Sequence, residues 1–295
     1  MSVSIRPLHP VFVGEVAGID CCRSLAAHDV AALEAGMDRY AVLVFRNQFI
    51  NDDEQLAFTR HFGELEAYRT PGHIRRRDAQ RLGPGMADFS NLDKHGDIMP
   101  ADDRVWFFKL ADRLWHSDSS FRPVPAKYSL LSARVLPSWG GDTGFADMRA
   151  AYDALDARTK AEIEDLVCLH SLIYSRAAIG FTDLSPEEQA AFQPVPQRLV
   201  RTHPVTGRKS LFLSAHAGEI EGMALPQARM LLLDLTEFAT RERFVYAHVW
   251  RVNDLVMWDN RSTMHRGRRF DPNEVRDIRQ TRLAGDGPTI AQDAA

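Results

Sequence analysis

The sequence predicts a mainly β core, a sandwich or jelly roll, with helices packed outside it. Two observations lead to this fold class. The last third of the chain is a series of short runs rich in β-branched and aromatic residues, separated by turn residues. Segments with apolar residues at helical spacing occur mostly earlier in the chain. The composition of the 295 residues, 45% hydrophobic and 26% charged, is that of a globular protein with one large domain or two small ones.

The first third of the chain alternates between strand and helix signals. Residues 11–20 mix β-branched residues with two glycines, which predicts a strand pair that ends at a turn. Residues 29–40 have helical spacing and predict an amphipathic helix, and the apolar run 41–45 predicts a buried strand. Asn51 is a good N-cap, and the acidic residues that follow it favour a helix through Phe62.

Residues 67–86 have no periodic pattern. Arg75, Arg76 and Arg77 lie there among prolines and glycines. A loop this long inside a compact domain is usually functional or disordered. The segment is therefore interpreted either as a lid over an active site or as a mobile, solvated loop.

The middle of the chain mixes strands and helices. Strands are predicted at 87–92, 104–108, 128–136, a segment entered through the turn at 139–145, and 168–174. Helices are predicted at 148–155 and 158–166. The consecutive aromatics Trp106, Phe107 and Phe108 are interpreted as core residues of a strand. Residues 178–196 have weak periodicity and three prolines, which indicates an insertion.

The last third of the chain is the predicted β series. Its strands are expected at 198–203, 209–214, 244–250, 255–258 and 278–283. A hairpin turn at 204–207 would join the first two strands, and one helix, 225–240, interrupts the series.

The overall charge and the cysteines exclude several classes of protein. The formal net charge is −4, which argues against a broad nucleic-acid surface. Three cysteines, two of them adjacent, make no disulfide framework and suit a reducing compartment. The N-terminal residues do not resemble a signal peptide, and no apolar stretch is long enough to span a membrane. We therefore expect a cytoplasmic protein without nucleic-acid or membrane partners.

A candidate metal site comes from two segments far apart in the chain. His116 and Asp118 lie two residues apart, and side chains at that spacing in an extended segment point to the same face. His265 is the best candidate for a third ligand. Each signal alone is weak, since the chain has 11 histidines. Together, two histidines and one carboxylate form the arrangement of non-haem Fe(II) oxygenases, which leaves metal positions open.

An iron of this kind needs an electron donor to activate O2. If the donor is 2-oxoglutarate, its distal carboxylate needs a fixed cation, and Arg276 lies eleven residues beyond His265. Thr143, next to a double glycine, offers a hydroxyl to the same carboxylate. The alternative is that Arg276 belongs to a solvated basic face with the other arginines of this region, an interpretation we prefer for Arg268 and Arg269.

The sequence resembles the taurine dioxygenase / 2,4-dichlorophenoxyacetate dioxygenase family of Fe(II)- and 2-oxoglutarate-dependent enzymes, with a lean to the phenoxyacetate branch. The resemblance covers nearly the whole chain. It is carried by residues 114–121, 140–143, 147–155, 200–203 and 254–261. It implies a double-stranded β-helix (jelly roll) in a single domain over 1–295.

The same resemblance implies roles for individual residues. It implies that His116, Asp118 and His265 bind Fe(II) and that Thr143 and Arg276 contact 2-oxoglutarate. The implied reaction uses O2 and hydroxylates the carbon next to the ether oxygen of an aryloxyacetate, giving a phenol, glyoxylate, succinate and CO2. The expected binding partner of the chain is the small organic acid substrate. We also expect the chain to form a homo-oligomer.

One position departs from the family pattern. Family members often have a second arginine, which holds the substrate's acidic group, where this chain has Gln280. A glutamine can donate a hydrogen bond to a carboxylate but brings no charge. Candidate cations for an acidic substrate are Arg279, Arg282, Lys109 and Arg75–Arg77. Further candidates for substrate contacts are Ser119, Phe121, His203 and His216. The alternative for Phe121 is a core position, and for the two histidines structural roles are equally expected. Trp258 is expected to pack beneath the site.

Three alternatives stay open at this point. The same iron chemistry can act on a sulfonate, a sulfate ester or another small acid. A hydrolase is suggested by the serines beside His116 and Asp118, although no Gly-x-Ser-x-Gly motif surrounds them. A non-catalytic binding module on the same fold has no need of the cosubstrate residues Thr143 and Arg276.

Overall fold

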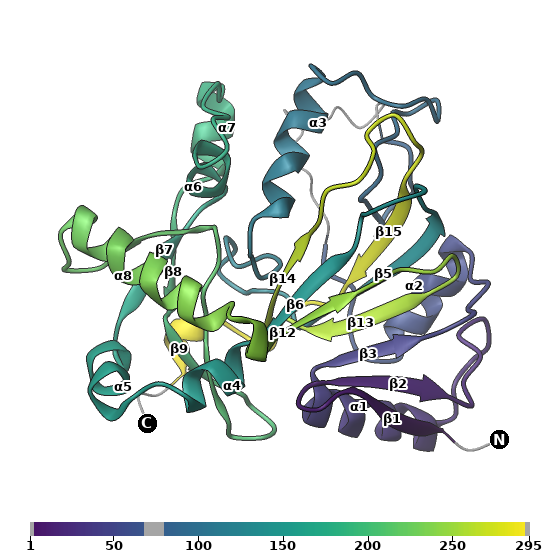
Figure 1. Cartoon of the computed structure of the whole chain (residues 1–295), viewed down its shortest axis with the longest axis horizontal. Coiled ribbons are helices and arrows are strands. Elements are labelled where there is room, and N and C mark those ends of the chain that lie inside the picture. Colours follow the sequence, from purple (N-terminus) through teal and green to yellow (C-terminus); the bar gives the residue numbers. More distant parts are fainter. Residues whose placement is uncertain (1–2, 68–79, 293–295) are drawn as a thin grey trace.

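The computed structural model describes residues 3–67 and 80–292, and within these ranges the strands form four sheets (Figure 1). The largest has seven strands in the order β1-β2-β3-β13-β5-β15-β4. These strands are β1 (Ser4–His9), β2 (Val13–Ala17), β3 (Val42–Phe45), β4 (Ala87–Asp88), β5 (Tyr128–Val135), β13 (Leu255–Asp259) and β15 (Asp277–Arg282). All neighbours pair antiparallel except β2 and β3.

Three smaller sheets complete the β structure. One contains β12 (Val245–His248), β6 (Thr143–Asp147) and β14 (Thr263–Gly267), in that order. A second contains β11 (Ala217–Ile220), β7 (Val167–His170) and β8 (Val195–Arg198). The third is the hairpin of β9 (Val200–Thr202) and β10 (Lys209–Leu211), in which the predicted turn at 204–207 is confirmed.

Helices cover the outside of these sheets, as predicted (Figure 1). The α-helices are α1 (Ala27–Tyr40), α2 (Asp52–Arg60), α3 (Arg104–Lys109), α4 (Met148–Asp153), α5 (Ala157–Ile163), α6 (Leu172–Ala177), α7 (Pro186–Ala191) and α8 (Leu225–Ala239). The described residues also form the 3-10 helices η2 (Leu110–Arg113), η3 (Glu242–Phe244) and η4 (Thr289–Ala291). None of the helices in the described part of the chain is long and apolar enough to cross a membrane.

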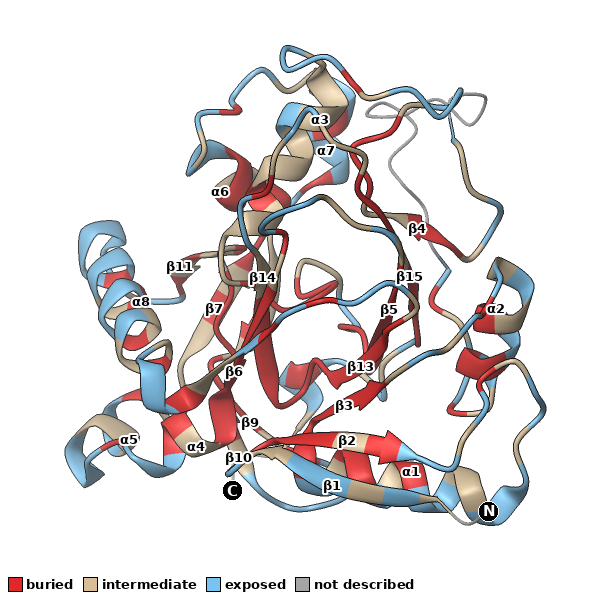
Figure 2. Ribbon diagram, turned by 45° about the vertical axis from the view of Figure 1, so that its right-hand side comes forward, coloured by how far each residue is buried: buried red, intermediate tan, exposed pale blue. Residues whose placement is uncertain are grey.

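The seven-stranded sheet and the β12-β6-β14 sheet pack face to face. Phe145 of β6 lies in one buried cluster with Val256 and Trp258 of β13 and Ile278 of β15. Side chains on the opposite face of the large sheet pack against α1 and α2, and those on the outer face of the small sheet pack against α4 and α8. The buried strands surround the centre of the molecule in Figure 2. The predicted mainly β core with flanking helices is confirmed.

Strand alternation decides which side chains reach the space between the two sheets. Successive side chains of a strand point to opposite faces, and directly paired residues share a face. On β14, His265 pairs with Phe145 and therefore points inward. On β15, Gln280 lies two residues after the inward-facing Ile278 and shares its face, whereas Arg279 points outward.

Several local predictions are confirmed with their physical causes. Helix α2 begins after Asn51, whose side chain accepts from the Glu54 backbone N–H while the Glu54 carboxylate accepts from Asn51 N–H, a capping box. The predicted helices at 29–40, 148–155, 158–166 and 225–240 correspond to α1, α4, α5 and α8. The predicted strands at 41–45, 128–136, 244–250, 255–258 and 278–283 correspond to β3, β5, β12, β13 and β15.

Other local predictions are wrong. Residues 104–108 form helix α3 instead of a strand, because Asp103 caps it by accepting from the backbone N–H groups of Val105 and Trp106. The strand predicted over 168–174 ends at His170, because the Ser171 hydroxyl accepts from Ile173 N–H and begins α6. The strand predicted at 87–92 is only the two residues of β4.

Three further segments differ from the prediction in extent. The N-terminal strand pair is β1 and β2, so it begins before residue 11. The candidate insertion 178–196 contains α7, capped by Ser185. The candidate lid 67–86 falls partly outside the described residues, and so do Arg75–Arg77.

Candidate metal centre

His116, Asp118 and His265 come together in the interior of the molecule. Each offers one ligand atom, and these atoms all lie within 4.8 Å of one another. The two segments that carry them are joined by reciprocal backbone hydrogen bonds, from His116 N to His265 O at 2.9 Å and from His265 N to His116 O at 2.8 Å. All three side chains are buried. The structure thus assembles the predicted two-histidine, one-carboxylate group.

The local geometry of the first two ligands differs from the expected extended segment. His116 forms a single β-bridge to His265, and Asp118 already begins a turn in which Ser119 has a φ of 55°. The backbone N–H of Asp118 donates to the Asn260 side-chain oxygen at 3.1 Å. That hydrogen bond fixes where the turn begins, so the carboxylate is placed by a contact with a residue 142 positions away.

Hydrogen bonds hold the Asp118 carboxylate in one orientation. Its Oδ2 accepts from the Ser129 hydroxyl at 2.7 Å and from the Gln280 amide at 2.9 Å. Arg282 Nη1 lies 3.5 Å from Oδ1. Burial alone would raise the pKa of Asp118, but His265, Arg282 and His116 hold it below its usual value. The carboxylate is therefore ionised, as a metal ligand must be.

The two histidines are arranged as neutral ligands. His116 Nδ1 donates to the Leu114 carbonyl at 2.8 Å, which leaves the lone pair of Nε2 free. Burial, followed by the neighbouring His116, lowers the pKa of His265 to about 3, so its ring is neutral. The Nδ1 atom of His265 is buried without a hydrogen-bond partner in the described structure. Trp258 packs beside the His265 ring with centroids 4.7 Å apart, which confirms its predicted place beneath the site.

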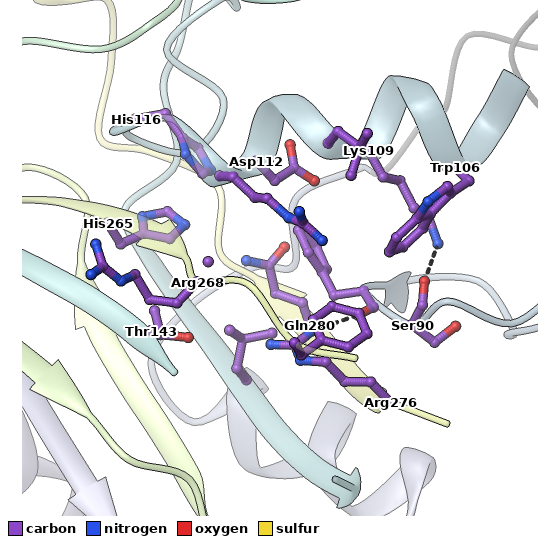
Figure 3. A pocket seen from close by; sticks show the side chains of 16 residues that line it. Ser90, Trp106, Lys109, Asp112, His116, Thr143, His265, Arg268, Arg276 and Gln280 are labelled. Carbon is purple, nitrogen blue, oxygen red and sulfur yellow. Dashed lines mark hydrogen bonds between the residues drawn. The ribbon is translucent and has the colours of Figure 1, made fainter. Parts of the chain in front are cut away.

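Thr143 and Arg276 lie in the same pocket as His116 and His265 (Figure 3). Thr143 Oγ1 accepts from Trp250 Nε1 at 3.0 Å, so its hydroxyl proton remains available to a ligand. Arg276 donates to the carbonyls of Phe89 at 3.0 Å and Gly141 at 3.2 Å, while its Nε is buried without a partner in the described residues. Burial and then the charge of Arg113 lower the pKa of Arg276 to about 10.

Gly141 allows Arg276 to approach the chain. Its φ of 77° is in the left-handed region, and a Cβ built there would lie 3.1 Å from Arg276 Nε. The double glycine noted in the sequence therefore makes room for the guanidinium beside Thr143.

The pocket is lined by both apolar and charged side chains. Its lining comprises Phe89, Ser90, Trp106, Lys109, Leu110, Asp112, Arg113, His116, Leu131, Thr143, His265, Gly267, Arg268, Phe270, Arg276 and Gln280. Helix α3 lies across the pocket from Gln280 of β15 and from Arg276, which directly precedes that strand (Figure 3). Trp106, Lys109, Leu110 and Arg113 recur at helical spacing and face the pocket together.

Among the residues proposed from the sequence as substrate contacts, Gln280 and Lys109 line this pocket. The lining does not include Arg279, Ser119, Phe121, His203 or His216. Arg279 pairs with Asp52 and Asp277, both at 2.8 Å, and lines a separate surface hollow. His203 Nε2 donates to Asp259 at 3.0 Å in a buried cluster. Those contacts give Arg279 and His203 structural functions outside the pocket.

The remaining three candidates lie near the metal ligands but do not line the pocket. Ser119 is fully buried in the turn after Asp118. The His216 ring packs edge-on to His116 with centroids 5.9 Å apart, and Phe121 packs on His216 at 5.0 Å. His216 thus packs against His116 and Phe121 against His216, and neither residue lines the pocket.

The hydrolase alternative finds no support in the serines. Ser117 Oγ donates to the Thr263 carbonyl at 3.0 Å. The hydroxyls of Ser117 and Ser119 are buried, and neither residue lines the pocket.

Several residues with a function in the site were not proposed from the sequence. Ser129 and Asn260 orient Asp118, Trp250 orients Thr143, and Trp106 and Arg113 line the pocket. The helical spacing of Trp106 and Arg113 was the available signal, but the strand predicted at 104–108 obscured it. Ser129, Asn260 and Trp250 act through long-range contacts, which a single sequence does not encode as a pattern.

The residues present fit an Fe(II) site. Two imidazoles and one carboxylate are a donor set that leaves positions free for other ligands. Nε2 of His265 lies 3.8 Å from Asp118 Oδ2, so the imidazole and the carboxylate could bind one ion together.

Comparisons with known proteins agree with this geometry. Residues 4–282 match the family described as taurine catabolism dioxygenase TauD, TfdA family. The chain is 46% identical over 288 residues to an alpha-ketoglutarate-dependent 2,4-dichlorophenoxyacetate dioxygenase of Cupriavidus pinatubonensis, covering 97% of this chain and 99% of that protein. The protein of the same description from Burkholderia sp. (strain RASC) is 45% identical over 287 residues, covering 97% of this chain and 95% of the relative.

A solved structure extends the similarity to three dimensions. The crystal structure of AAD-2 in complex with Mn(II) and N-oxalylglycine superposes with a TM-score of 0.95 at 55% identity, covering 98% of this chain and 100% of that one. The predicted double-stranded β-helix (jelly roll) is confirmed. By its sequence over residues 4–282 and by its fold, the chain belongs to the TauD/TfdA dioxygenase family.

Proposed function

We propose that the chain is an Fe(II)- and 2-oxoglutarate-dependent dioxygenase that hydroxylates the carbon next to the ether oxygen of an aryloxyacetate such as 2,4-dichlorophenoxyacetate. The products are a phenol, glyoxylate, succinate and CO2. The observation that carries this proposal is the meeting of His116, Asp118 and His265 with Arg276 and Thr143 in a single pocket. A metal site and a buried cation in one pocket suit a dicarboxylate that binds both.

The protein's part in this reaction is to hold and orient the reactants. His116, Asp118 and His265 would hold Fe(II) through neutral imidazoles and an ionised carboxylate. When bound, Fe(II) with 2-oxoglutarate and O2 supplies the oxidising chemistry that converts the cosubstrate to succinate and CO2 and places a hydroxyl on the substrate carbon. The Ser129 and Gln280 hydrogen bonds keep Asp118 from rotating away from this arrangement.

Arg276 and Thr143 would bind the distal carboxylate of 2-oxoglutarate. The guanidinium is held by two backbone carbonyls and keeps its Nε free, while the Thr143 hydroxyl is oriented by Trp250. Since both groups are already in place, binding requires little reorganisation. This preorganisation also argues against a mere binding module.

The aryloxyacetate is supported by two observations. The relatives that are 45–46% identical over almost their full length carry the description 2,4-dichlorophenoxyacetate dioxygenase. The pocket also offers Phe89, Trp106 and Leu110 to an apolar ring. These two observations favour an aryloxyacetate over the alternative of a sulfonate or sulfate ester.

Anaerobic titration with Fe(II) and 2-oxoglutarate tests the chemistry. A visible charge-transfer band should appear, and 2,4-dichlorophenoxyacetate should perturb it. His116→Ala should lose both the band and substrate-dependent succinate production, whereas His95→Ala, at an exposed histidine, should keep both. Absence of the band in the wild-type protein, or succinate production by His116→Ala, would refute the proposed function.

Other expectations from the sequence stay predictions. They are a single domain over 1–295, a homo-oligomeric assembly, a cytoplasmic location and the absence of nucleic-acid and membrane partners. Gel filtration with light scattering measures the assembly directly.

A further inference from the structure

The pocket contains more positive charge than the proposed cosubstrate requires. Arg276 and Arg113 both line it, with their Cζ atoms 5.2 and 5.7 Å from the centre of the Phe270 ring. Within residues 3–67 and 80–292, no carboxylate forms an ion pair with either guanidinium. If the proposed function holds, the metal takes one end of 2-oxoglutarate and Arg276 the other. The charge of Arg113 is then left for a different anion.

Arg113 is placed to meet a ligand. It is the last residue of η2 and shares the pocket-facing side with Trp106 and Leu110. Its Cζ lies 5.9 Å from the centre of the Trp106 ring, so two aromatic rings flank a half-buried guanidinium. Burial, and then the charge of Arg269, lower the pKa of Arg113, which is the effect of a cation without an anion beside it.

The other candidate cations already have partners or face solvent. Arg282 lies 3.0 Å from Glu66 and 3.5 Å from Asp118, and Arg279 pairs with Asp52 and Asp277. Lys109 donates to the Ser90 carbonyl at 2.9 Å, the contact drawn in Figure 3. Arg268 is exposed, so water screens its charge.

The acidic and amide groups of the pocket do not compete for Arg113. Asp112, which also lines the pocket, pairs with Arg176 at 3.4 Å. Gln280 carries no charge, and its amide donates to Asp118. An acidic substrate in this pocket would therefore pair with a cation on η2 and not on β15.

We propose that Arg113 binds the acid group of the organic substrate. A planar guanidinium can donate two parallel hydrogen bonds to a carboxylate. The apolar side chains beside it would contact the aryl group. The acid group would bind at η2, which ends three residues before His116. Arg113 is thus a specificity-determining residue of the proposed site.

Calorimetry on the protein loaded with Mn(II) and N-oxalylglycine separates substrate binding from turnover. The wild type should bind 2,4-dichlorophenoxyacetate more tightly than its neutral amide. Arg113→Gln should weaken binding of the acid roughly 10- to 100-fold, the usual effect of losing a charged hydrogen bond, and leave the amide unchanged. Arg113→Lys, which keeps the charge, should retain part of the preference for the acid.

Two controls make the result specific. Arg229→Gln removes an exposed arginine from α8 and should behave as the wild type. N-oxalylglycine should bind Arg113→Gln with wild-type affinity, which also shows that the variant is folded. The inference is overturned if Arg113→Gln binds the acid normally, if it loses N-oxalylglycine instead, or if the wild type does not prefer the acid. Failure of the proposed function has a different signature, the missing Fe(II)–2-oxoglutarate band in the wild type.

Discussion

The amide of Gln280 donates a hydrogen bond to Oδ2 of Asp118 at 2.9 Å, from β15 to the turn that carries the carboxylate ligand. Removing it should reduce the affinity for the metal, because a ligand that is free to rotate must be ordered on binding. Gln280→Leu is expected to weaken Fe(II) or Mn(II) binding by about tenfold or more. Metal titration by calorimetry measures this change.

Arg279→Gln is the matched control for that prediction. Arg279 precedes Gln280 on the same strand but points to the opposite face, where it pairs with Asp52. Its loss should leave metal affinity unchanged. Equal metal affinities of Gln280→Leu and wild type would show that the hydrogen bond does not orient Asp118.

Arg276→Gln should raise the Kd for 2-oxoglutarate by roughly 10- to 100-fold, because the distal carboxylate loses a charged partner in a buried site. Titration of the anaerobic Fe(II) protein with 2-oxoglutarate gives the Kd. Arg269→Gln, at a neighbouring exposed arginine, should leave the Kd at its wild-type value. An unchanged Kd in Arg276→Gln would remove Arg276 from the cosubstrate site.

Gly141→Ala should weaken 2-oxoglutarate binding through Arg276, since the added Cβ would lie 3.1 Å from its Nε. Gly222→Ala is the matched control, because Gly222 has a similar φ of 73° but nothing within 4 Å of an added Cβ. Both variants should lose about 1 kcal/mol of stability from the left-handed backbone. Only Gly141→Ala should change the Kd, and an equal Kd in the two variants contradicts the argument.

Asp259→Asn should lower the free energy of unfolding by about 3–5 kcal/mol, because it leaves the buried Arg261 without its main countercharge. In the wild type Arg261 Nη2 donates to Asp259 at 2.8 Å, and His203 donates to the same carboxylate. Urea unfolding measures the loss. Asp153→Asn, at the exposed pair with Arg208, should change stability by less than about 1 kcal/mol. Similar losses in both variants would contradict the prediction.

His170 should make the protein less stable as the pH falls below 6.5. Its ring is fully buried with both nitrogens unpartnered in the described structure, and burial lowers its pKa from 6.5 to about 3. Between these pH values the unfolded chain binds a proton that the folded protein does not. The free energy of unfolding therefore decreases as the pH is lowered from 6.5 to about 3. From pH 7.5 to 5.5 this amounts to about 1 kcal/mol.

His170→Phe keeps a ring against Phe212 and removes the titrating group. Urea unfolding at both pH values should show that the variant loses about 1 kcal/mol less than the wild type on acidification. His95→Gln, at an exposed histidine, should keep the wild-type difference. Identical pH dependence in His170→Phe and wild type would exclude His170 as the cause.

The predicted strands and helices were most accurate where the hydrophobic pattern is continuous. Strands β5, β13 and β15 are strongly patterned because one face or both pack in the core. The sequence pattern does not predict strand β14, because its inward side chains, Thr263, His265 and Gly267, give no apolar alternation. The aromatic run of helix α3 has β propensity and predicts a strand, but the Asp103 cap outweighs this propensity.

The candidate site residues His116, Asp118, His265, Thr143 and Arg276 can be named from residue types and their order along the chain. The charges that are available to a ligand can be identified only in the folded protein. Alternation along β15 directs Arg279 to Asp52 and Gln280 to Asp118, while the turn of α3 into η2 brings Arg113 to the pocket. A cation's availability depends on which carboxylates the fold places beside it, and those contacts join residues far apart in the chain.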